Sequence, residues 1–212
     1  MTLSVRGISE SDAKQSLETY CGRSSLYSWP YYDIDKTPNL LEPTDILATS
    51  FLNYSPEFKI IQKLMQEYEM YSETSEYTKL FKLLSDVVTD ESAKGLCYDD
   101  IPEEQLGDRE MGGWGKVLTA IDAAQECKYL TSVFVTKVLH RKRPNLVPIN
   151  DSKLRKFYGI KKHGYSDLFL AIHRDVIQNR DYLDELRGKY VLPNGAVMSR
   201  LRVLDIVVWM NQ

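Results

Sequence analysis

The sequence has 212 residues, of which 43% are hydrophobic and 27% are charged, with a formal net charge of −3. These values are ordinary for one globular domain or two small lobes, and they argue against a disordered chain. No stretch approaches the roughly 20 apolar residues of a membrane-spanning helix, and the first residues lack the layout of a signal peptide, so we expect a cytoplasmic protein without membrane contact.

Helical spacing begins after an irregular N-terminal segment, residues 22–43, which is rich in aromatic and turn-forming residues. Helices are predicted from Thr44 or Asp45 until Pro56, at 58–68 and at 77–87. Residues 89–112 are acidic and rich in turn formers. They are the candidate boundary between a lobe of residues 1–100 and a lobe of residues 110–212, within a single unit.

The C-terminal half continues the helical pattern, with helices predicted around residues 117–121 and 133–139, and then at 150–158, 166–180 and 196–210. Arg143-Pro144 should end the second of these, because proline disfavours the helical conformation of the residue before it. Gly159 should close the third. No series of strands is evident, so the expected class is mainly α.

Cysteine and histidine usage gives no sign of a metal or a cofactor. Cys21, Cys97 and Cys127 are an odd number, lie far apart and form no C-x-x-C pair, and the histidines do not cluster with them at zinc spacing. We therefore expect buried, reduced thiols, no metal site and no cofactor.

Basic residues are concentrated between Lys128 and His163. This segment holds ten Lys or Arg and one acid, Asp151, whereas the rest of the chain has 17 basic and 29 acidic residues. A cationic face on an acidic body is the charge distribution expected of a protein that captures phosphates at one place. The alternative is a basic helix face that serves only solubility.

Asp151 opens a predicted helix, directly after the extended run Asn145–Ile149. Asp is a favoured residue at helix N-termini, where it accepts hydrogen bonds from free backbone amides. A carboxylate among phosphate-binding cations has a second use, because it can stabilise positive charge that develops on a sugar ring when a glycosidic bond breaks.

The stretch from Lys128 to Ile160 resembles the core of the helix-hairpin-helix DNA glycosylase superfamily. In that superfamily a hairpin and its following helix lead through a short extended link to an Asp that opens the next helix, as Val147-Pro-Ile-Asn-Asp151 does here. The resemblance implies a two-lobed helical fold, double-stranded DNA as partner, and a DNA glycosylase that flips a damaged or modified base, with Asp151 as the catalytic residue.

The sequence also resembles a bacterial family of uncharacterised proteins marked by K-R-P-x-L-[VI]-P and then Asp. The matching string is Lys142-Arg-Pro-Asn-Leu-Val-Pro148. Further matches are Tyr31-Tyr32-Asp33, Pro38-Asn39, Asp45-Ile-Leu-Ala48, Leu52-Asn53, Leu201-Arg-Val-Leu-Asp205 and Trp209. A bacterial source would add defence against phage with modified bases to DNA repair as an expected role.

The chain departs from the glycosylase pattern at the hairpin, Glu126–Ser132, which lacks the glycines that let backbone amides approach a DNA phosphate. The lysine that forms a Schiff base in lyase-type members would fall near Val133, and Lys128 and Lys137 lie about one turn to either side. The departure predicts a monofunctional enzyme in which water is the nucleophile and Asp151 stabilises the sugar cation or orients that water.

Other residues are predicted to bind the DNA or to form the pocket for the flipped base. The candidates for binding DNA are Lys128, Lys137, Arg141, Lys142, Arg143, Lys153 and Arg155. The candidates for a pocket that stacks on a flipped base and reads its donor groups are Tyr27, Trp29, Tyr31, Tyr32, Asp33 or Asp35, and Trp114. The alternative for the aromatic residues is that they fill the seam between two lobes.

Two other functions fit parts of the sequence. Asp151-Ser152-Lys153 matches half of a two-carboxylate motif of metal-dependent nucleases, which would require a strand at 149–153 and a second carboxylate nearby. A non-catalytic DNA-binding protein on the same fold would explain the missing hairpin glycines.

Overall fold

The computed structural model describes residues 5–22, 31–54, 61–62, 76–127, 130–160, 165–191 and 195–212. Within these ranges the protein is mainly helical, as predicted, and strand-like pairing is limited to two isolated bridges, Val5 with Ile8 and Val191 with Val197. The candidate residues Tyr27, Trp29 and Lys128, and most of the helix predicted at 58–68, lie outside the described residues.

The described helices are, in chain order, α1 (Glu10–Cys21), α2 (Pro43–Ala48), the 3-10 helix η1 (Thr49–Leu52), α4 (Glu76–Thr89), α5 (Glu91–Lys94), η2 (Tyr98–Asp100), η3 (Glu103–Gln105), α6 (Gly112–Ala123), α7 (Ser132–Lys142), α8 (Ser152–Tyr158), α9 (Tyr165–Gln178), α10 (Arg180–Arg187) and α11 (Arg200–Met210). No helix among these is both long enough and apolar enough to cross a bilayer.

Local signals explain most helix ends near the site. Helix α7 stops at Lys142, with Arg143 as its C-cap before Pro144. Helix α8 closes on Gly159, whose φ of 69° is the left-handed conformation that glycine adopts without steric cost. The helix predicted at 196–210 is shorter than expected, because Ser199 caps it by accepting a hydrogen bond from the Arg202 amide.

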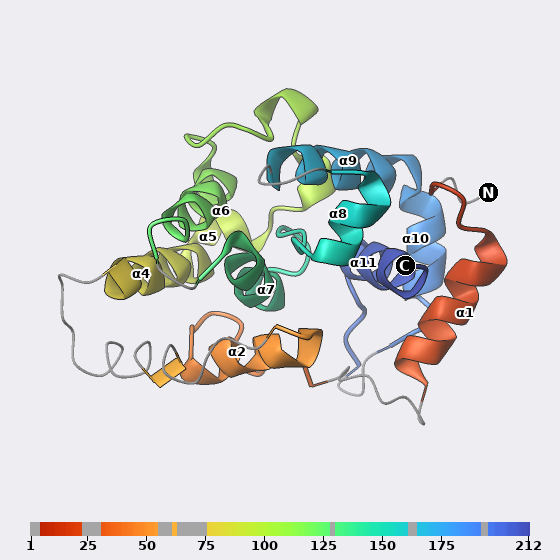
Figure 1. The fold of residues 1–212 in the computed structure, drawn as a ribbon, viewed down its shortest axis with the longest axis horizontal. Helices are drawn as coiled ribbons and strands as arrows, with labels where there is room; N and C mark the ends of the chain where they lie inside the picture. The colour runs from red at the N-terminus through yellow and green to blue at the C-terminus, as the bar shows by residue number, and fades with distance from the viewer. Residues whose placement is uncertain are drawn as a thin grey trace.

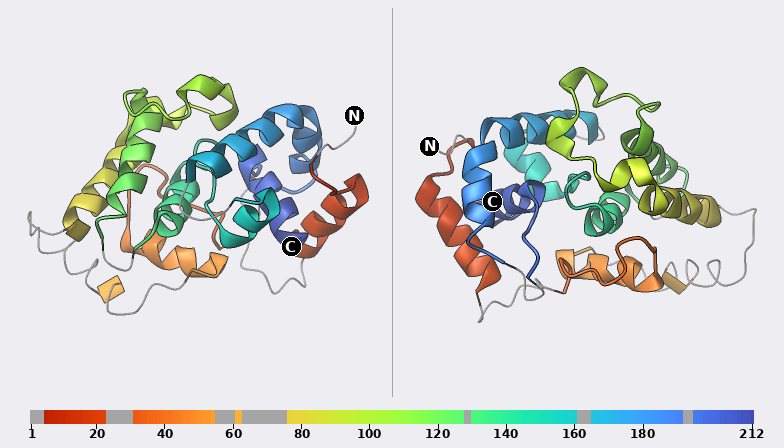
Figure 2. Two further views of the ribbon diagram at one scale, coloured as in Figure 1. Left: turned by 45° about the horizontal axis from the view of Figure 1, so that its top comes forward. Right: turned by 180° about the vertical axis from the view of Figure 1, so that it is seen from behind.

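The helices form two groups that share one apolar core (Figures 1 and 2). Helices α4 to α7 contact one another at one end, and α8 to α11 pack with α1 at the other. Helix α1 lies against α11, so the beginning and the end of the described chain meet. Helix α4 lies against α6, across the boundary predicted at 89–112, so these spatial groups differ from the predicted lobes.

Helix α7 occupies the centre of the molecule and contacts α2, η1, α4 and α6 (Figure 2). Its residues from Phe134 to His140 are all buried. A charged side chain on such a helix must find its partners inside the protein, because burying an unpaired charge is costly. This requirement shapes the candidate site.

Candidate functional site

The two carboxylate oxygens of Asp151 have different partners, one at the start of α8 and one in a pocket. It is the N-cap of α8, where Oδ1 accepts a hydrogen bond of 2.9 Å from the Lys153 amide. Its Oδ2 lies 3.2 Å from Nζ of Lys137. The cap therefore uses one oxygen, and the other forms an ion pair with Lys137 in the lining of a pocket.

Lys137 points from the central helix α7 into the same pocket. Its side chain is 3% exposed, and Nζ also donates a 2.7 Å hydrogen bond to the carbonyl of Leu52 at the end of η1. Lys137 therefore joins α7, η1 and the start of α8 at one point. Its burial means that it cannot contact a DNA phosphate on the surface, in contrast to its predicted role.

The pocket between these elements, here called the Asp151 pocket, is small, with a volume of about 30 Å³. Its polar lining consists of Tyr20, Asn53, Lys137, Asp151, Arg202 and Asp205. Its apolar lining consists of Phe51, Leu52, Ile149, Ile206 and Trp209. A cavity needs roughly 10–15 Å³ and two to four polar partners to hold a water molecule, so this one has room for water.

Asp205 brings a second carboxylate to the pocket from α11. Its Oδ2 accepts a 2.5 Å hydrogen bond from Arg202, one turn earlier on the same helix. The pKa of Asp205 is raised to about 6, mainly by burial and also by the negative charge of Asp151, while Arg202 and Lys137 act to lower it. The pocket thus contains a carboxyl group that changes charge near neutral pH.

Arg202 is the centre of a buried group that we call the Arg202 cluster, formed with Asp33, Asp205, Tyr20 and Tyr32. It pairs with Asp33 at 2.8 Å and 3.2 Å and donates to the Tyr20 hydroxyl at 2.7 Å. The guanidinium also lies 5.2 Å from the ring centroid of Tyr32. Tyr32 and Asp33 are therefore structural neighbours of Arg202, and neither lines the pocket as the base-binding prediction expected.

Arg141, Lys142 and Arg143 are anchors inside the protein, which differs from the predicted phosphate contacts. Lys142 has a fully buried side chain that pairs with Asp45 at 2.8 Å and Asp35 at 3.1 Å. Arg141 pairs with Asp45 at 3.1 Å and donates to backbone carbonyls of residues 31, 32 and 34. Arg143 donates to the carbonyls of residues 38 and 88. Together they fasten residues 31–45 to α7.

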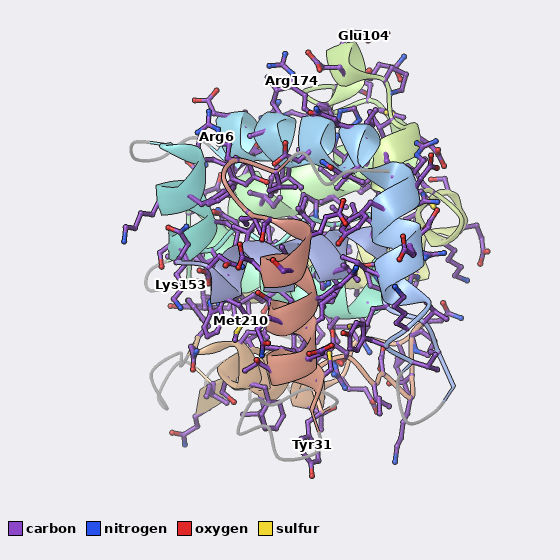
Figure 3. The ribbon with its side chains drawn as sticks, turned by 90° about the vertical axis from the view of Figure 1, so that its right-hand side faces the viewer. Arg6, Tyr31, Glu104, Lys153, Arg174 and Met210 are labelled. Carbon is purple, nitrogen blue, oxygen red and sulfur yellow. The ribbon has the colours of Figure 1, made fainter. Side chains whose placement is uncertain are left out.

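Two of the predicted DNA-binding cations remain partly exposed at the start of α8. Lys153 lies 3.6 Å from the ring centroid of Trp209, so the beginning of α8 and the end of α11 are side by side (Figure 3). Arg155 donates a 2.6 Å hydrogen bond to the buried side chain of Asn150. Lys153 therefore lies beside the pocket, since Trp209 forms part of the lining.

The predicted aromatic residues separate in the structure. Trp114 on α6 is fully buried, packs with Tyr98 of η2 and Phe169 of α9, and does not line the Asp151 pocket. Its ring therefore lies where the two groups of helices meet, as the alternative of a seam between lobes expected. Tyr31 is 69% exposed and points away from the body of the protein (Figure 3). Its ring lies 5.8 Å from that of Phe51, which is 42% exposed and lines the pocket.

Several pocket residues were absent from the predicted site, namely Tyr20, Phe51, Arg202, Asp205 and Trp209. A signal for three of them was present in the sequence. Arg202, Asp205 and Trp209 occur at helical spacing in an otherwise apolar run, so they fall on one face of α11. Charged residues on a face that must be buried indicate a polar site within the core.

A two-carboxylate nuclease motif was expected to need a second carboxylate and a strand at 149–153. Asp205 supplies a second carboxylate in the same pocket, but the strand is not formed. Asp151 begins a helix rather than lying on a strand, and Lys153 turns toward Trp209. In the part of the chain that the structure describes, no group of three or more His, Cys, Asp or Glu side chains is arranged to hold a metal ion.

Comparison with curated proteins and with solved structures found no match. The model of one protein family matches residues 13–212, which include every element that lines the Asp151 pocket. The chain therefore belongs to the family of unknown function DUF6308.

Proposed function

We propose that this protein is a DNA glycosylase that hydrolyses the N-glycosidic bond of a damaged or modified nucleotide. The observation that carries the proposal is the position of Asp151, whose Oδ2 faces a small polar pocket while Oδ1 caps α8. The resemblance of residues 128–160 to helix-hairpin-helix glycosylases supports the same assignment, because it matches an Asp at the start of a helix after a short extended link.

The chemistry follows from charge. Breaking the bond between C1′ and the base leaves positive charge on the sugar, and a carboxylate held close to that atom stabilises the transition state more than the ground state. An aspartate is ionised at neutral pH. The N-cap and the ion pair with Lys137 fix the Asp151 carboxylate in place, so little reorganisation is needed when the cation forms.

Water is the nucleophile in this proposal. The pocket volume of about 30 Å³ suits water, and Lys137, Asp151 and Asp205 supply polar partners for it. Lys137 is an unsuitable nucleophile in this arrangement, because an amine must be deprotonated to attack, whereas its Nζ is engaged by a carboxylate and a carbonyl. The enzyme would then be monofunctional.

In this proposal a flipped base lies at the rim of the small pocket. Phe51 and Trp209 are partly exposed lining residues that offer flat surfaces for stacking. Tyr31 extends the aromatic surface from Phe51, and Lys153 offers a charge for a backbone phosphate. In this arrangement DNA approaches over η1 and the adjoining ends of α8 and α11.

Base release tests the proposal directly. The protein is incubated in EDTA with duplex DNA carrying a panel of modified bases, and free bases are identified by mass spectrometry. We expect release of a base and abasic sites that break only after alkali treatment. Direct strand cleavage that EDTA stops would indicate a nuclease instead, and binding without any release would indicate a non-catalytic DNA-binding protein.

Asp151→Asn is the decisive variant, because asparagine retains the helix cap but lacks the charge. It should lower base release by at least about 100-fold while leaving affinity for unmodified DNA unchanged. Asp90→Asn is the matched control, since Asp90 caps α5 and also pairs with a lysine, Lys116, away from the pocket. It should release base at the wild-type rate.

A further inference from the structure

Two carboxylates line the Asp151 pocket, and their surroundings differ. Asp151 has both oxygens engaged, one by the Lys153 amide and one by the Lys137 ammonium. Asp205 lies on α11, is 7% exposed, and accepts a hydrogen bond from Arg202 through Oδ2. Carboxylates in one site whose environments differ in this way commonly take different roles in catalysis.

We propose that Asp205 is a second catalytic carboxylate of the Asp151 pocket and that it takes the proton of the attacking water. This proposal rests on the proposed glycosylase function, and it names a residue that the resemblance to helix-hairpin-helix glycosylases does not include.

Asp151 and Asp205 are assigned different roles because their carboxylates have different surroundings. Asp151 accepts from an ammonium and a backbone amide, so it is an anion held in a fixed position where it can stabilise a nearby cation. The pKa of Asp205, raised to about 6 mainly by burial, suits a general base that is mostly ionised at neutral pH. A general base is most effective when its pKa lies near the working pH.

The charged and titratable groups that act on Asp205 come from every element around it. They are Arg202 on α11, Asp151 at the start of α8, Lys137 on α7, and, around Arg202, Asp33 and the hydroxyls of Tyr20 and Tyr32. Arg202 is a positioning residue, since Asp33 and Tyr20 hold its guanidinium while it holds Oδ2 of Asp205.

The proposed step conserves atoms and charge. The bond between C1′ and the base nitrogen breaks, and its electron pair leaves with the base. The water oxygen bonds to C1′, and one water proton passes to the Asp205 carboxylate. The departing base gains a proton either directly from Asp205 or from solvent, and in the second case Asp205 loses its own proton to solvent, so that the carboxyl group returns to its ionised state. Asp151 remains an anion throughout and stabilises the sugar cation.

The pH dependence of base release tests this role. For the wild type, the single-turnover rate should rise through a pKa near 6 and level off above it. Asp205→Asn should lower the rate about 100-fold or more and abolish the rise, while Asp205→Glu should recover part of both. Asp175→Asn is the control, because Asp175 is also a partly buried carboxyl with a raised pKa but lies outside the pocket, bonded to Tyr158.

A measurement on the wild-type protein covers the case in which Asp205→Asn does not fold. In carbon-13 NMR of labelled aspartates, the Asp205 carboxyl should titrate near pH 6, and Asp151→Asn should lower that pKa because it removes a neighbouring negative charge. Titration of Asp205 near pH 4, or no response to Asp151→Asn, would overturn the proposal.

The outcomes separate this proposal from the function on which it rests. If the wild type releases no base from any substrate, both proposals fail. If the wild type releases base and depends on Asp151, but Asp205→Asn keeps the wild-type rate and pH profile, only the role of Asp205 fails.

Discussion

The Nζ atom of Lys137 lies 3.2 Å from Oδ2 of Asp151, and the two residues belong to consecutive helices, α7 and α8. The contact is buried, and it connects the link between these helices to η1 through the Leu52 carbonyl. It places a lysine and an aspartate together in a pocket of the size of one or two water molecules. Whether the lysine acts as a nucleophile is therefore the first question for experiment.

Borohydride reduction tests whether Lys137 acts as a nucleophile. A lysine that attacks C1′ forms a Schiff base, which borohydride converts into a stable bond between protein and DNA. Because the Lys137 ammonium is engaged by Asp151 and Leu52, we expect no such product from abasic DNA. A trapped product that forms with the wild type but not with Lys137→Met would show that the enzyme is a lyase.

Lys142→Met should destabilise the protein without affecting DNA binding directly. Its fully buried ammonium pairs with Asp35 and Asp45, and removal of one partner from a buried ion pair costs about 3–5 kcal/mol. The free energy of unfolding, measured in urea, should fall by about that amount. Lys156→Met, at an exposed position of α8, should change it by less than about 0.5 kcal/mol.

The opposite pattern would contradict the anchoring role of residues 141–143. If these side chains bind phosphates instead, Lys142→Met should leave stability intact and reduce the dependence of DNA affinity on salt concentration.

The exposed aromatic pair should contribute to DNA binding. Replacing Tyr31 and Phe51 by alanine removes two rings that lie 5.8 Å apart beside the pocket, and loss of stacking on a base costs roughly 1–3 kcal/mol. We expect weaker binding to duplex DNA with an abasic site, measured by fluorescence anisotropy, and unchanged unfolding. Ile177→Ala is the control, since Ile177 is 47% exposed on α9 and lines no part of the pocket.

Equal affinity of the aromatic double variant and the Ile177→Ala control would place the DNA on another face.

Two buried groups should give opposing contributions to stability in acid. Burial lowers the pKa of His140 to about 4, so its folded state resists protonation and stability is lost as pH falls from 6.5 toward 4. The pKa of Asp205 is raised to about 6, so its folded state binds a proton more tightly and stability is gained as pH falls from 6 toward 3.8. Each effect amounts to about 3 kcal/mol at 1.36 kcal/mol per pKa unit.

Asp205→Asn removes the stability gain that comes from Asp205 and keeps the loss that comes from His140. The difference in free energy of unfolding, wild type minus variant, should therefore increase by about 3 kcal/mol as the pH falls from 6.5 to 4. A difference between the two proteins that stays constant over this range would mean that the pKa of Asp205 is not raised by folding.

Local sequence was sufficient to predict the helix boundaries around Asp151. Pro144 ends α7, Asp151 caps α8 and Gly159 closes it, and each of these signals acts within a few residues. The mainly helical class followed from the 3.6-residue spacing of apolar residues in the same way.

The environment of the basic residues could not be predicted, because it depends on pairs that are distant in sequence. Arg141 and Lys142 meet Asp45 from 96 and 97 positions earlier, and Arg202 meets Asp33. The predicted cationic face rested on ten basic residues and one acid, and it assumed that all of these side chains face solvent. Helix α7 is instead central, and Asp35 and Asp45 neutralise two of them, Arg141 and Lys142.

The second carboxylate was missed for the same reason. Asp205 reaches the pocket only because α11 packs against α8 and α1, and no local pattern specifies that packing. A resemblance confined to residues 128–160 could not include a residue on the last helix.

The most direct test of a carboxylate that stabilises a sugar cation does not require the target base to be known. Duplex DNA carrying a single cationic pyrrolidine analogue of an abasic site mimics the charge of the transition state, and the neutral tetrahydrofuran analogue serves as reference. Transition-state mimics bind at least about 100-fold more tightly than ground-state analogues. The wild type should bind the cationic analogue more tightly by at least about tenfold, and Asp151→Asn should bind both analogues equally. Equal affinity of the wild type for the two analogues would contradict the proposed role of Asp151.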